Sequence, residues 1–215
     1  MRAIVFANGL LDRLPLSIEP ITIKDLIIAA DGGLRHCKMM NLIPHLIIGD
    51  LDSVDQMDLA KMRLSGSEVI QYPVRKDETD LELSLKIALE RGAHEIVIIG
   101  ALGARWDMTF SNVLILAADF LKNVHVRIVD GPQEMICIRK DHSITFKGRV
   151  GHGVSLFPLS ESVDGITLLG MEYPLNNERL YLGSTRGLSN VIVDSIASIQ
   201  VSKGILLALT GQYLL

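Results

Sequence analysis

Nearly continuous aliphatic runs are the feature that most restricts how this chain can fold. Up to about residue 130 these runs alternate with longer segments of helical period. A strand built almost entirely of Ile, Val, Leu and Ala is buried on both faces, which is typical of a parallel sheet with helices on each side. This part of the chain therefore predicts an α/β doubly wound, mostly parallel sheet. The runs expected to form its strands are Ala3–Ala7, Leu26–Ala30, His45–Ile48, Glu68–Tyr72, Glu95–Ile99 and Val124–Val129.

The segments between these runs have the signals of helices. The third segment is the clearest, because Thr79 can cap it, Glu82 stands at the capping-box position and Gly92 follows its end. Asp52 or Ser53 can cap the helix before it in the same way. The expected helices are Gly33–Asn41, Asp55–Leu64, Asp80–Arg91 and Thr109–Lys122.

The pattern changes after Asp130-Gly131-Pro132. The segments that follow are short, β-branched or alternating, and separated by turn residues, which predicts a small all-β sandwich. Its expected strands are Glu134–Arg139, Ser143–Lys147, Val154–Leu159, Val163–Leu169, Arg179–Gly183, Val191–Ile199 and Gly204–Thr210. We therefore expect an α/β domain at 1–130 and a β-sandwich domain at 131–215.

The composition excludes several classes of protein. The chain is 48% hydrophobic and 21% charged, so it can bury a core and is not a disordered chain. Its apolar runs are far shorter than the ~20 residues of a membrane-spanning helix. Cys37 and Cys137 are not in a CxxC spacing, and the six histidines lack the spacing of metal ligands. We expect a cytoplasmic protein that binds neither membranes nor nucleic acid, since no basic block is present.

The acidic residues gather in the first part of the chain, where 18 acidic residues stand against 14 basic ones before residue 131, with 7 of each after it. Asp31, Asp50 and Asp52 directly follow expected strands, and Asp80 begins a helix. Because the carboxyl ends of parallel strands meet at one edge of a sheet, these side chains should converge. Converging carboxylates repel each other unless a cation lies between them, and Mg²⁺ suits such oxygen ligands.

A glycine-rich turn follows the fifth expected strand. Gly100 to Gly103 offer backbone N–H groups near the start of a helix, which favours phosphate oxygens. Lys76 and Arg105 can neutralise further phosphate charge. From the residues alone, the prediction is a metal-dependent site for a polyphosphate nucleotide, in a phosphoryl-transfer enzyme whose acceptor stays open.

These motifs, taken in order, resemble the thiamine pyrophosphokinase family over essentially the whole chain. The most specific set is GDxDS, KDxTD and GxxGxRxD. The matching segments are DGG (31–33), GDLDS (49–53), KDETD (76–80), GALGARWD (100–107) with Asn112, SLFPLS (155–160), Gly170–Leu175 and Leu188-Ser189-Asn190.

The resemblance implies that ATP and Mg²⁺ convert thiamine to thiamine diphosphate with release of AMP. It also implies a homodimer with the active site at the subunit interface. By position, Asp50, Asp52 and Asp80 would hold the metal, with Asp31 nearby. These four aspartates are the candidate catalytic residues, and our mechanistic hypothesis is that Asp31 or Asp80 accepts the hydroxyl proton. The residues implied for the nucleotide are Gly33, Lys76, Asp77, Thr79, Gly103, Arg105, Asp107 and Asn112, and those implied for thiamine are Ser189 and Asn190.

Three other functions compete with this one. A diphosphokinase for another alcohol, such as a hydroxymethylpterin, keeps the fold and the reaction. An NAD-dependent oxidoreductase shares the doubly wound sheet, but the first strand leads to Asn8-Gly9-Leu10 and not to GxGxxG. A catalytically inactive thiamine- or nucleotide-binding protein is the third, because Met108 stands where many bacterial members have His. Val191 likewise replaces a glutamate that often follows the Ser-Asn pair.

Overall fold

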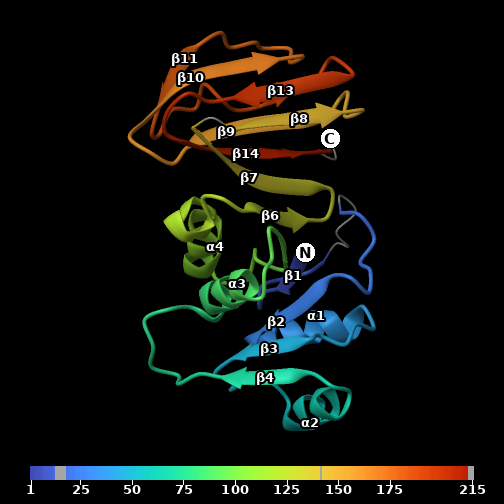
Figure 1. The fold of residues 1–215 in the computed structure, drawn as a ribbon. Coiled ribbons are helices and arrows are strands. Elements are labelled where there is room, and N and C mark those ends of the chain that lie inside the picture. The colour runs from blue at the N-terminus through green and yellow to red at the C-terminus, as the bar shows by residue number, and fades with distance from the viewer. Residues whose placement is uncertain (13–17, 141, 213–215) are drawn as a thin grey trace. The chain divides into compact units, whose positions relative to one another are not determined.

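The computed structural model describes residues 1–12, 18–140 and 142–212. The chain divides into two compact units, Met1–Gly131 and Pro132–Leu215, called here unit 1 and unit 2 (Figure 1). The division lies at the Gly131-Pro132 step, where the residue pattern of the sequence also changes.

Unit 1 contains a parallel sheet with the strand order β6-β5-β1-β2-β3-β4. Every ladder between these neighbours is parallel. The expectation of a mostly parallel sheet is confirmed. The strands are β1 (Arg2–Phe6), β2 (Leu26–Ala30), β3 (Leu46–Gly49), β4 (Glu68–Gln71), β5 (Glu95–Ile99) and β6 (His125–Asp130).

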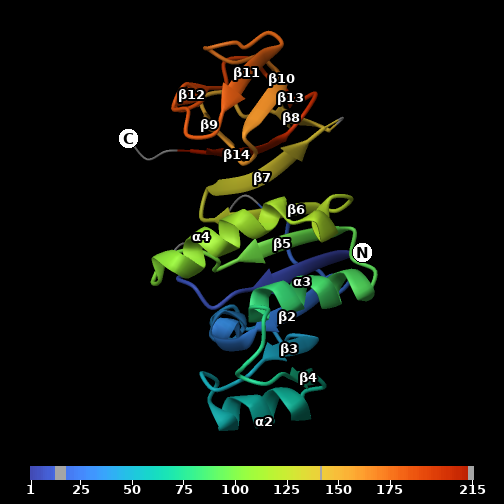
Figure 2. The same cartoon turned by 90° about the vertical axis from the view of Figure 1, so that its left-hand side faces the viewer.

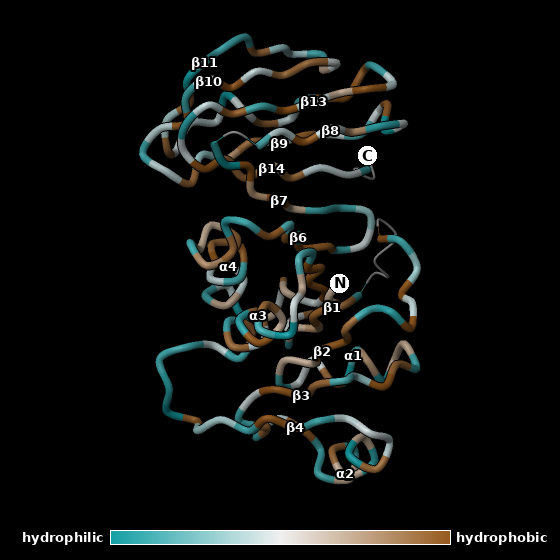
Figure 3. The backbone as a smooth tube through the Cα atoms, in the orientation of Figure 1, coloured by the Kyte–Doolittle hydropathy of each residue, from teal (hydrophilic) through white to brown (hydrophobic). Residues whose placement is uncertain are grey.

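Helices pack against this sheet (Figure 2) and explain why its strands are aliphatic throughout. Ile4 and Phe6 share a core cluster with Leu34 and Cys37 of the helix α1 (Leu34–Met39). Because side chains alternate along a strand, Val5 points to the opposite face, where α3 (Asp80–Glu90) packs on β1 to β3, and it is fully buried. Figure 3 shows that strands β1 to β3 are hydrophobic, whereas the connection that leads into α3 is hydrophilic.

The expected helix at 109–122 is wrong in both of its bounds. The helix α4 spans Trp106–Leu114, and two 3-10 turns follow it at Ile115–Ala117 and Asp119–Leu121. Ala118 between the turns has extended dihedral angles (φ −62°, ψ 142°), which ends the helical path. The change in direction buries Leu116 and Leu121 in the core.

The cap of the helix α2 (Gln56–Leu64) also differs from the expectation. Asp55 caps α2, because its carboxylate accepts hydrogen bonds from the backbone N–H groups of Met57 (2.8 Å) and Asp58 (3.1 Å). Asp52 and Ser53 are therefore not its caps, and both side chains are available to the site described below.

Unit 2 is a sandwich of two antiparallel sheets, as expected. Their strand orders are β12-β9-β14-β7 and β11-β10-β13-β8. One core cluster takes Ile138 and Leu206 from the first sheet and Phe146 and Ile199 from the second. The strands are β7 (Gln133–Arg139), β8 (Ser143–Lys147), β9 (Gly153–Pro158), β10 (Ser162–Leu169), β11 (Glu178–Tyr181), β12 (Asn190–Val191), β13 (Ile196–Gln200) and β14 (Ile205–Gly211).

The single strand expected at 191–199 is wrong, since β12 and β13 belong to different sheets. Between them, the N–H groups of Val193 and Asp194 donate to the carbonyl oxygen of Gly170, at 3.0 and 3.3 Å. This loop contact replaces ladder bonds and lets the chain cross from one sheet to the other.

Among the described residues, the helices are too short or too polar to cross a bilayer.

Candidate active site

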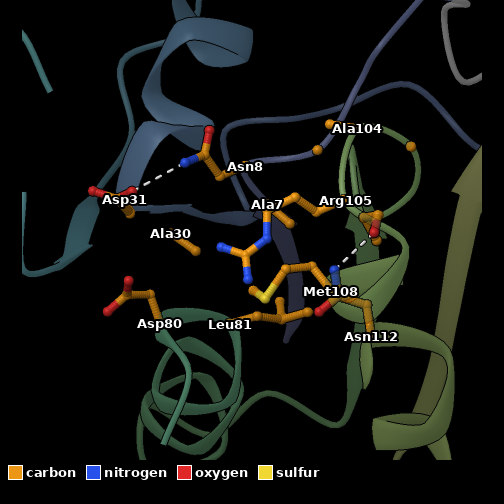
Figure 4. A pocket seen from close by; sticks show the side chains of 13 residues that line it. Ala7, Asn8, Ala30, Asp31, Asp80, Leu81, Ala104, Arg105, Met108 and Asn112 are labelled. Atoms are coloured by element: carbon orange, nitrogen blue, oxygen red, sulfur yellow. Dashed lines mark hydrogen bonds between the residues drawn. The ribbon is translucent and has the colours of Figure 1, made fainter. Parts of the chain in front are cut away.

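The strand order of unit 1 creates a switch point beside β1. The chain builds β1 to β4 outward in one direction and then returns to place β5 on the other side of β1. Ligands of open α/β sheets bind beyond the carboxyl ends of the strands at such a point. A cavity of about 250 Å³ lies there (Figure 4). Its polar lining residues are Asn8 after β1, Asp31 after β2, Arg105 after β5, Asp80 at the start of α3 and Asn112 within α4.

The carboxylates expected to converge do so. Asp31, Asp50 and Asp52 each place an oxygen within 4.8 Å of the others. Asp80 lies beside them, because a Cβ atom at Gly49 would be 3.0 Å from the Asp31 Cβ and 3.2 Å from the Asp80 Cγ. A residue without a side chain is therefore needed at position 49 for these two aspartates to approach. We call Asp31, Asp50, Asp52 and Asp80 the acidic cluster.

Asp31 is held in an unusual way. Its backbone is left-handed (φ 48°), which costs free energy in a non-glycine residue. Its Oδ2 atom accepts hydrogen bonds from Asn8 Nδ2 (3.0 Å) and Ser53 Oγ (2.5 Å). Its Oδ1 atom is buried and has no hydrogen-bond partner among the residues that the structure describes. A buried carboxylate oxygen without a partner is costly, and a bound cation would satisfy it.

Lys76 balances part of the charge of the acidic cluster. Its Nζ lies 2.9 Å from Asp80 Oδ1 and 3.8 Å from Asp50 Oδ2. Burial nevertheless raises the pKa of Asp80 above its ordinary value, although Lys76 acts in the opposite direction. The charge of Asp50 is the main cause that raises the pKa of Asp52. The cluster therefore carries more negative charge than Lys76 neutralises.

These residues fit a divalent metal ion. The donors are carboxylate oxygens, which Mg²⁺ prefers, and the buried Asp31 Oδ1 atom has no hydrogen-bond partner in the part of the chain that the structure describes. The sequence-based metal set was Asp50, Asp52 and Asp80. The geometry brings Asp31 into closest grouping with Asp50 and Asp52, and pairs Asp80 with Lys76.

The turn after β5 forms another wall of the cavity. Asn112 is buried in α4 and donates to the carbonyl oxygen of Ala101 (2.7 Å), which fixes the start of this turn. Gly103 adopts a left-handed φ of 80°. Arg105 and Asp107 form an exposed ion pair at 2.5 Å, and this pair lowers the pKa of Asp107. Asn112 therefore has a structural bond in addition to its place in the cavity wall.

Several residues implied by the family resemblance lie outside the cavity lining. Gly33 permits a close approach, since a Cβ there would be 2.0 Å from the carbonyl oxygen of Phe6. Thr79 caps α3 by accepting a hydrogen bond from Glu82 N–H (3.1 Å). Asp77 is exposed in the connection that precedes α3, and Asp107 pairs with Arg105.

Sequence reasoning missed Asn8 as a member of the site. In the sequence, Asn8 stands out only because it departs from a dinucleotide-binding motif, yet it lines the cavity and donates a hydrogen bond to Asp31. The available signal was its position, because a polar residue that directly follows a buried parallel strand lies at the ligand-binding edge.

Unit 2 has a pocket of its own, of about 490 Å³. Leu168, Leu175 and Leu188 give it apolar walls, while Glu172 and Arg186 add charged groups. Asn190 is buried in its wall, and its amide bonds the backbone of Tyr173 twice: Nδ2 donates to the carbonyl oxygen (2.7 Å) and Oδ1 accepts from N–H (3.0 Å).

Ser189, the other residue implied for thiamine, is exposed next to Asn190. Its backbone is left-handed (φ 59°), and its N–H donates to Ser155 Oγ at 3.1 Å. Asn190 therefore belongs to the wall of this pocket, whereas Ser189 is not among the described residues that line it.

Comparisons with known proteins agree with this arrangement. Residues 21–128 match the family model of the thiamin pyrophosphokinase catalytic domain, and residues 141–206 match that of the thiamin pyrophosphokinase vitamin B1 binding domain. A thiamine pyrophosphokinase of Bacillus subtilis is 31% identical over 182 residues, which is 85% of each chain.

Solved structures give the same result over the full length. The crystal structure of thiamine pyrophosphokinase from Bacillus subtilis matches with a TM-score of 0.86 and 28% identity, covering 100% of both chains. That of thiamin pyrophosphokinase from Geobacillus thermodenitrificans matches with a TM-score of 0.82 and 27% identity, covering 100% of this chain and 99% of the other. The two family models, the full-length structural matches and the cavity with its acidic cluster lead to one conclusion: the chain belongs to the thiamin pyrophosphokinase family.

Proposed function

We propose that this chain is a thiamine diphosphokinase that uses the cavity of unit 1 to transfer a diphosphoryl group from ATP to the hydroxyl of thiamine. The products are thiamine diphosphate and AMP. The observation that carries this proposal is the acidic cluster at the switch point of the sheet, in a chain of this family. Its buried Asp31 Oδ1 atom has no hydrogen-bond partner among the residues described by the structure.

Asp31, Asp50 and Asp52, with Asp80 beside them, are the residues that would hold Mg²⁺. When bound, Mg²⁺ supplies positive charge that binds the phosphate oxygens of ATP and offsets the charge of the reacting group.

The other polar groups of the cavity position the nucleotide. Arg105 is suited to bidentate bonds with phosphate oxygens, and the turn at Gly103 offers backbone N–H groups. Lys76, which now pairs with Asp80, adds a positive charge close to the phosphates. The proposed nucleotide contacts of Gly33, Asp77, Thr79, Asp107 and Asn112 rest on the family resemblance.

In the reaction, the hydroxyl oxygen of thiamine forms a bond to the β-phosphorus of ATP. The bond between that phosphorus and the oxygen bridging to the α-phosphorus breaks, and AMP leaves with the bridging oxygen. Asp31 or Asp80 accepts the hydroxyl proton.

We further propose that Ser189 and Asn190 of unit 2 contact thiamine. The match of residues 141–206 to a vitamin B1 binding domain supports this assignment. We also propose that the chain forms a homodimer with its active site at the subunit interface, which rests on the family resemblance. The proposed location is the cytoplasm. The comparisons favour neither a pterin alcohol as acceptor nor an NAD-dependent reaction.

The test is direct detection of both products. Purified protein is incubated with ATP, Mg²⁺ and thiamine, and AMP and thiamine diphosphate are quantified by chromatography. We expect the two products in equal amounts, and neither when thiamine is omitted or Mg²⁺ is removed with EDTA. Release of AMP only with a hydroxymethylpterin, or no product with either alcohol, would refute the proposal.

A further inference from the structure

Asn8 and Arg35 form a bonded chain that ends on the acidic cluster. Arg35 lies on α1 and donates to the carbonyl oxygens of Asn8 (3.0 Å) and Gly9 (2.6 Å), and also to the side-chain oxygen of Asn8. Asn8 in turn donates through Nδ2 to Asp31 Oδ2 (3.0 Å), as Figure 4 shows. Among the described residues, the hydrogen bonds of Arg35 therefore reach the cluster through Asn8.

These contacts fix which way the Asn8 amide points. The guanidinium can only donate, so it holds the amide oxygen, and the NH₂ group must then point at Asp31. Gly9 is held as well, because its carbonyl oxygen also lies 2.9 Å from His36 Nε2. The pKa of His36 is lowered by burial, which favours the neutral ring that donates through one nitrogen.

Gly32 shows that the Asn8 side chain occupies a tight, built position. A Cβ atom at Gly32 would lie 2.3 Å from Asn8 Oδ1, and its nearest contacts are all atoms of the Asn8 carboxamide. The residue next to Asp31 thus leaves room for this amide and for little else.

We propose that Asn8 and Arg35 are positioning residues of the acidic cluster: they orient the Asp31 carboxylate so that Oδ2 is held by donors and Oδ1 stays free for a cation. Asn8 acts on Asp31 directly, and Arg35 acts through Asn8. The inference rests on the proposed function for the identity of the cation, but its contacts do not depend on which alcohol the enzyme uses.

The sign of one effect separates this role from simple electrostatics. Arg35 is a positive charge near a cation site, so by charge alone its removal would strengthen metal binding. An orienting role predicts the reverse. Arg35→Lys keeps the charge but loses the planar fork that bonds three oxygens at once, so charge alone predicts no change for this variant.

The experiment measures Mn²⁺ binding to the metal-free protein by electron paramagnetic resonance, without nucleotide. Groups that orient metal ligands typically contribute about 10–100-fold to metal affinity. We expect Asn8→Ala, Arg35→Lys and Arg35→Met each to weaken Mn²⁺ binding about tenfold or more, and the double variant Asn8→Ala with Arg35→Met to be no weaker than Asn8→Ala alone. Asn123→Ala and Arg63→Lys, exposed residues outside the site, serve as matched controls that bind like wild type.

Gly32→Ala provides a second test that does not depend on removing a bond. It should weaken Mn²⁺ binding in the wild-type chain and have no further effect in the Asn8→Ala chain. If Arg35→Lys binds Mn²⁺ like wild type, or if Arg35→Met binds it more tightly, the inference is refuted while the proposed function stands. If the wild-type chain binds no Mn²⁺ at all, the metal site and this inference are both refuted.

Discussion

A buried carboxylate of unit 2 and a buried carboxylate of the unit 1 site differ in whether they have a partner. In unit 2, Glu134 is 2% exposed and forms an ion pair with Arg149. In unit 1, Asp31 is 8% exposed, and its Oδ1 atom has no hydrogen-bond partner among the described residues. The charge of Glu134 is therefore balanced within the chain, whereas a bound cation would be needed to satisfy the Oδ1 atom of Asp31.

Sheet architecture accounts for part of this difference. All strands of a parallel sheet end at the same edge, so loops after β2 and β3 bring Asp31, Asp50 and Asp52 together. Successive strands of an antiparallel sandwich end at opposite edges, which spreads polar residues out. Unit 2 instead forms separate ion pairs, such as Arg179 with Asp164 and Arg186 with Glu178. Parallel topology is thus suited to concentrating like charges.

The largest expected effect follows from removing a charge from the acidic cluster of unit 1. Asp50→Asn and Asp52→Asn should each lower kcat for AMP release by about 100-fold or more, because charge stabilisation of this kind typically contributes two to three orders of magnitude. The fold should survive, as circular dichroism would show. Near-normal turnover in both variants would remove these aspartates from the site.

Breaking the ion pair between Glu134 and Arg149 in unit 2 should lower the stability of the chain and leave turnover per folded molecule unchanged. Glu134→Gln leaves Arg149 without its charged partner, and we expect the free energy of unfolding to fall by about 1–3 kcal/mol. The effect is below that of a fully buried pair because Arg149 is partly exposed. Urea denaturation measures it, and an unchanged unfolding midpoint would show that the pair contributes nothing.

Asn190 offers a sharper test of unit 2. Asn190→Ala removes both bonds to the Tyr173 backbone, and each bond to a buried group contributes about 1 kcal/mol. We expect KM for thiamine to rise about 5–30-fold, while KM for ATP stays constant. Asn176→Ala, an exposed change near the same pocket, is the control. A rise in KM for ATP as well would contradict the assignment of Asn190 to thiamine alone.

Thr79 separates a structural role from a nucleotide contact. Thr79→Ala removes the cap of α3 and should lower the free energy of unfolding by about 1 kcal/mol, whereas Thr79→Ser retains the hydroxyl and should be nearly neutral. If Thr79→Ala left stability unchanged but raised KM for ATP, the cap would be unimportant and the nucleotide contact real.

The smallest effect concerns pH. The pKa of Asp52 is raised above its ordinary 3.8, mainly by Asp50, so the charged form is less favourable in the folded chain than in the unfolded chain. Its contribution to the stability of the metal-free protein is present below that ordinary value and is lost as the pH rises through the folded-state pKa.

Asp52→Asn should therefore be slightly more stable than wild type at neutral pH in EDTA, and the difference should vanish in acid. Denaturant titrations at the two pH values measure it. A variant less stable than wild type at neutral pH without metal would contradict the repulsion argument.

Much of the fold followed from residue pattern alone. Continuous aliphatic strands predicted the parallel sheet because both of its faces are covered, and Thr79 with Glu82 located the start of α3. The helix expected at 109–122 failed because Leu116 and Leu121 reach the core through 3-10 turns, a tertiary effect with no local signal.

The site also has features that the sequence predicts and features that it does not. Its acidic residues could be found, since each follows a strand or starts a helix. The bond of Asn8 to Asp31 could not be found, because it depends on which strands are neighbours. The ion pair of Lys76 with Asp80 joins residues only four positions apart, but it depends on side-chain rotamers. The pairing of β1 with β2 brings residues 23 positions apart into contact.

Gly49 has a practical consequence for anyone who wishes to alter this enzyme. The main chain of residue 49 lies between Asp31 and Asp80, and it limits how closely these two aspartates can approach. A methyl group at this position would push the loops that carry Asp31 and Asp80 apart. Residue 49 is therefore the first position to change when engineering the proposed metal site for a larger ion.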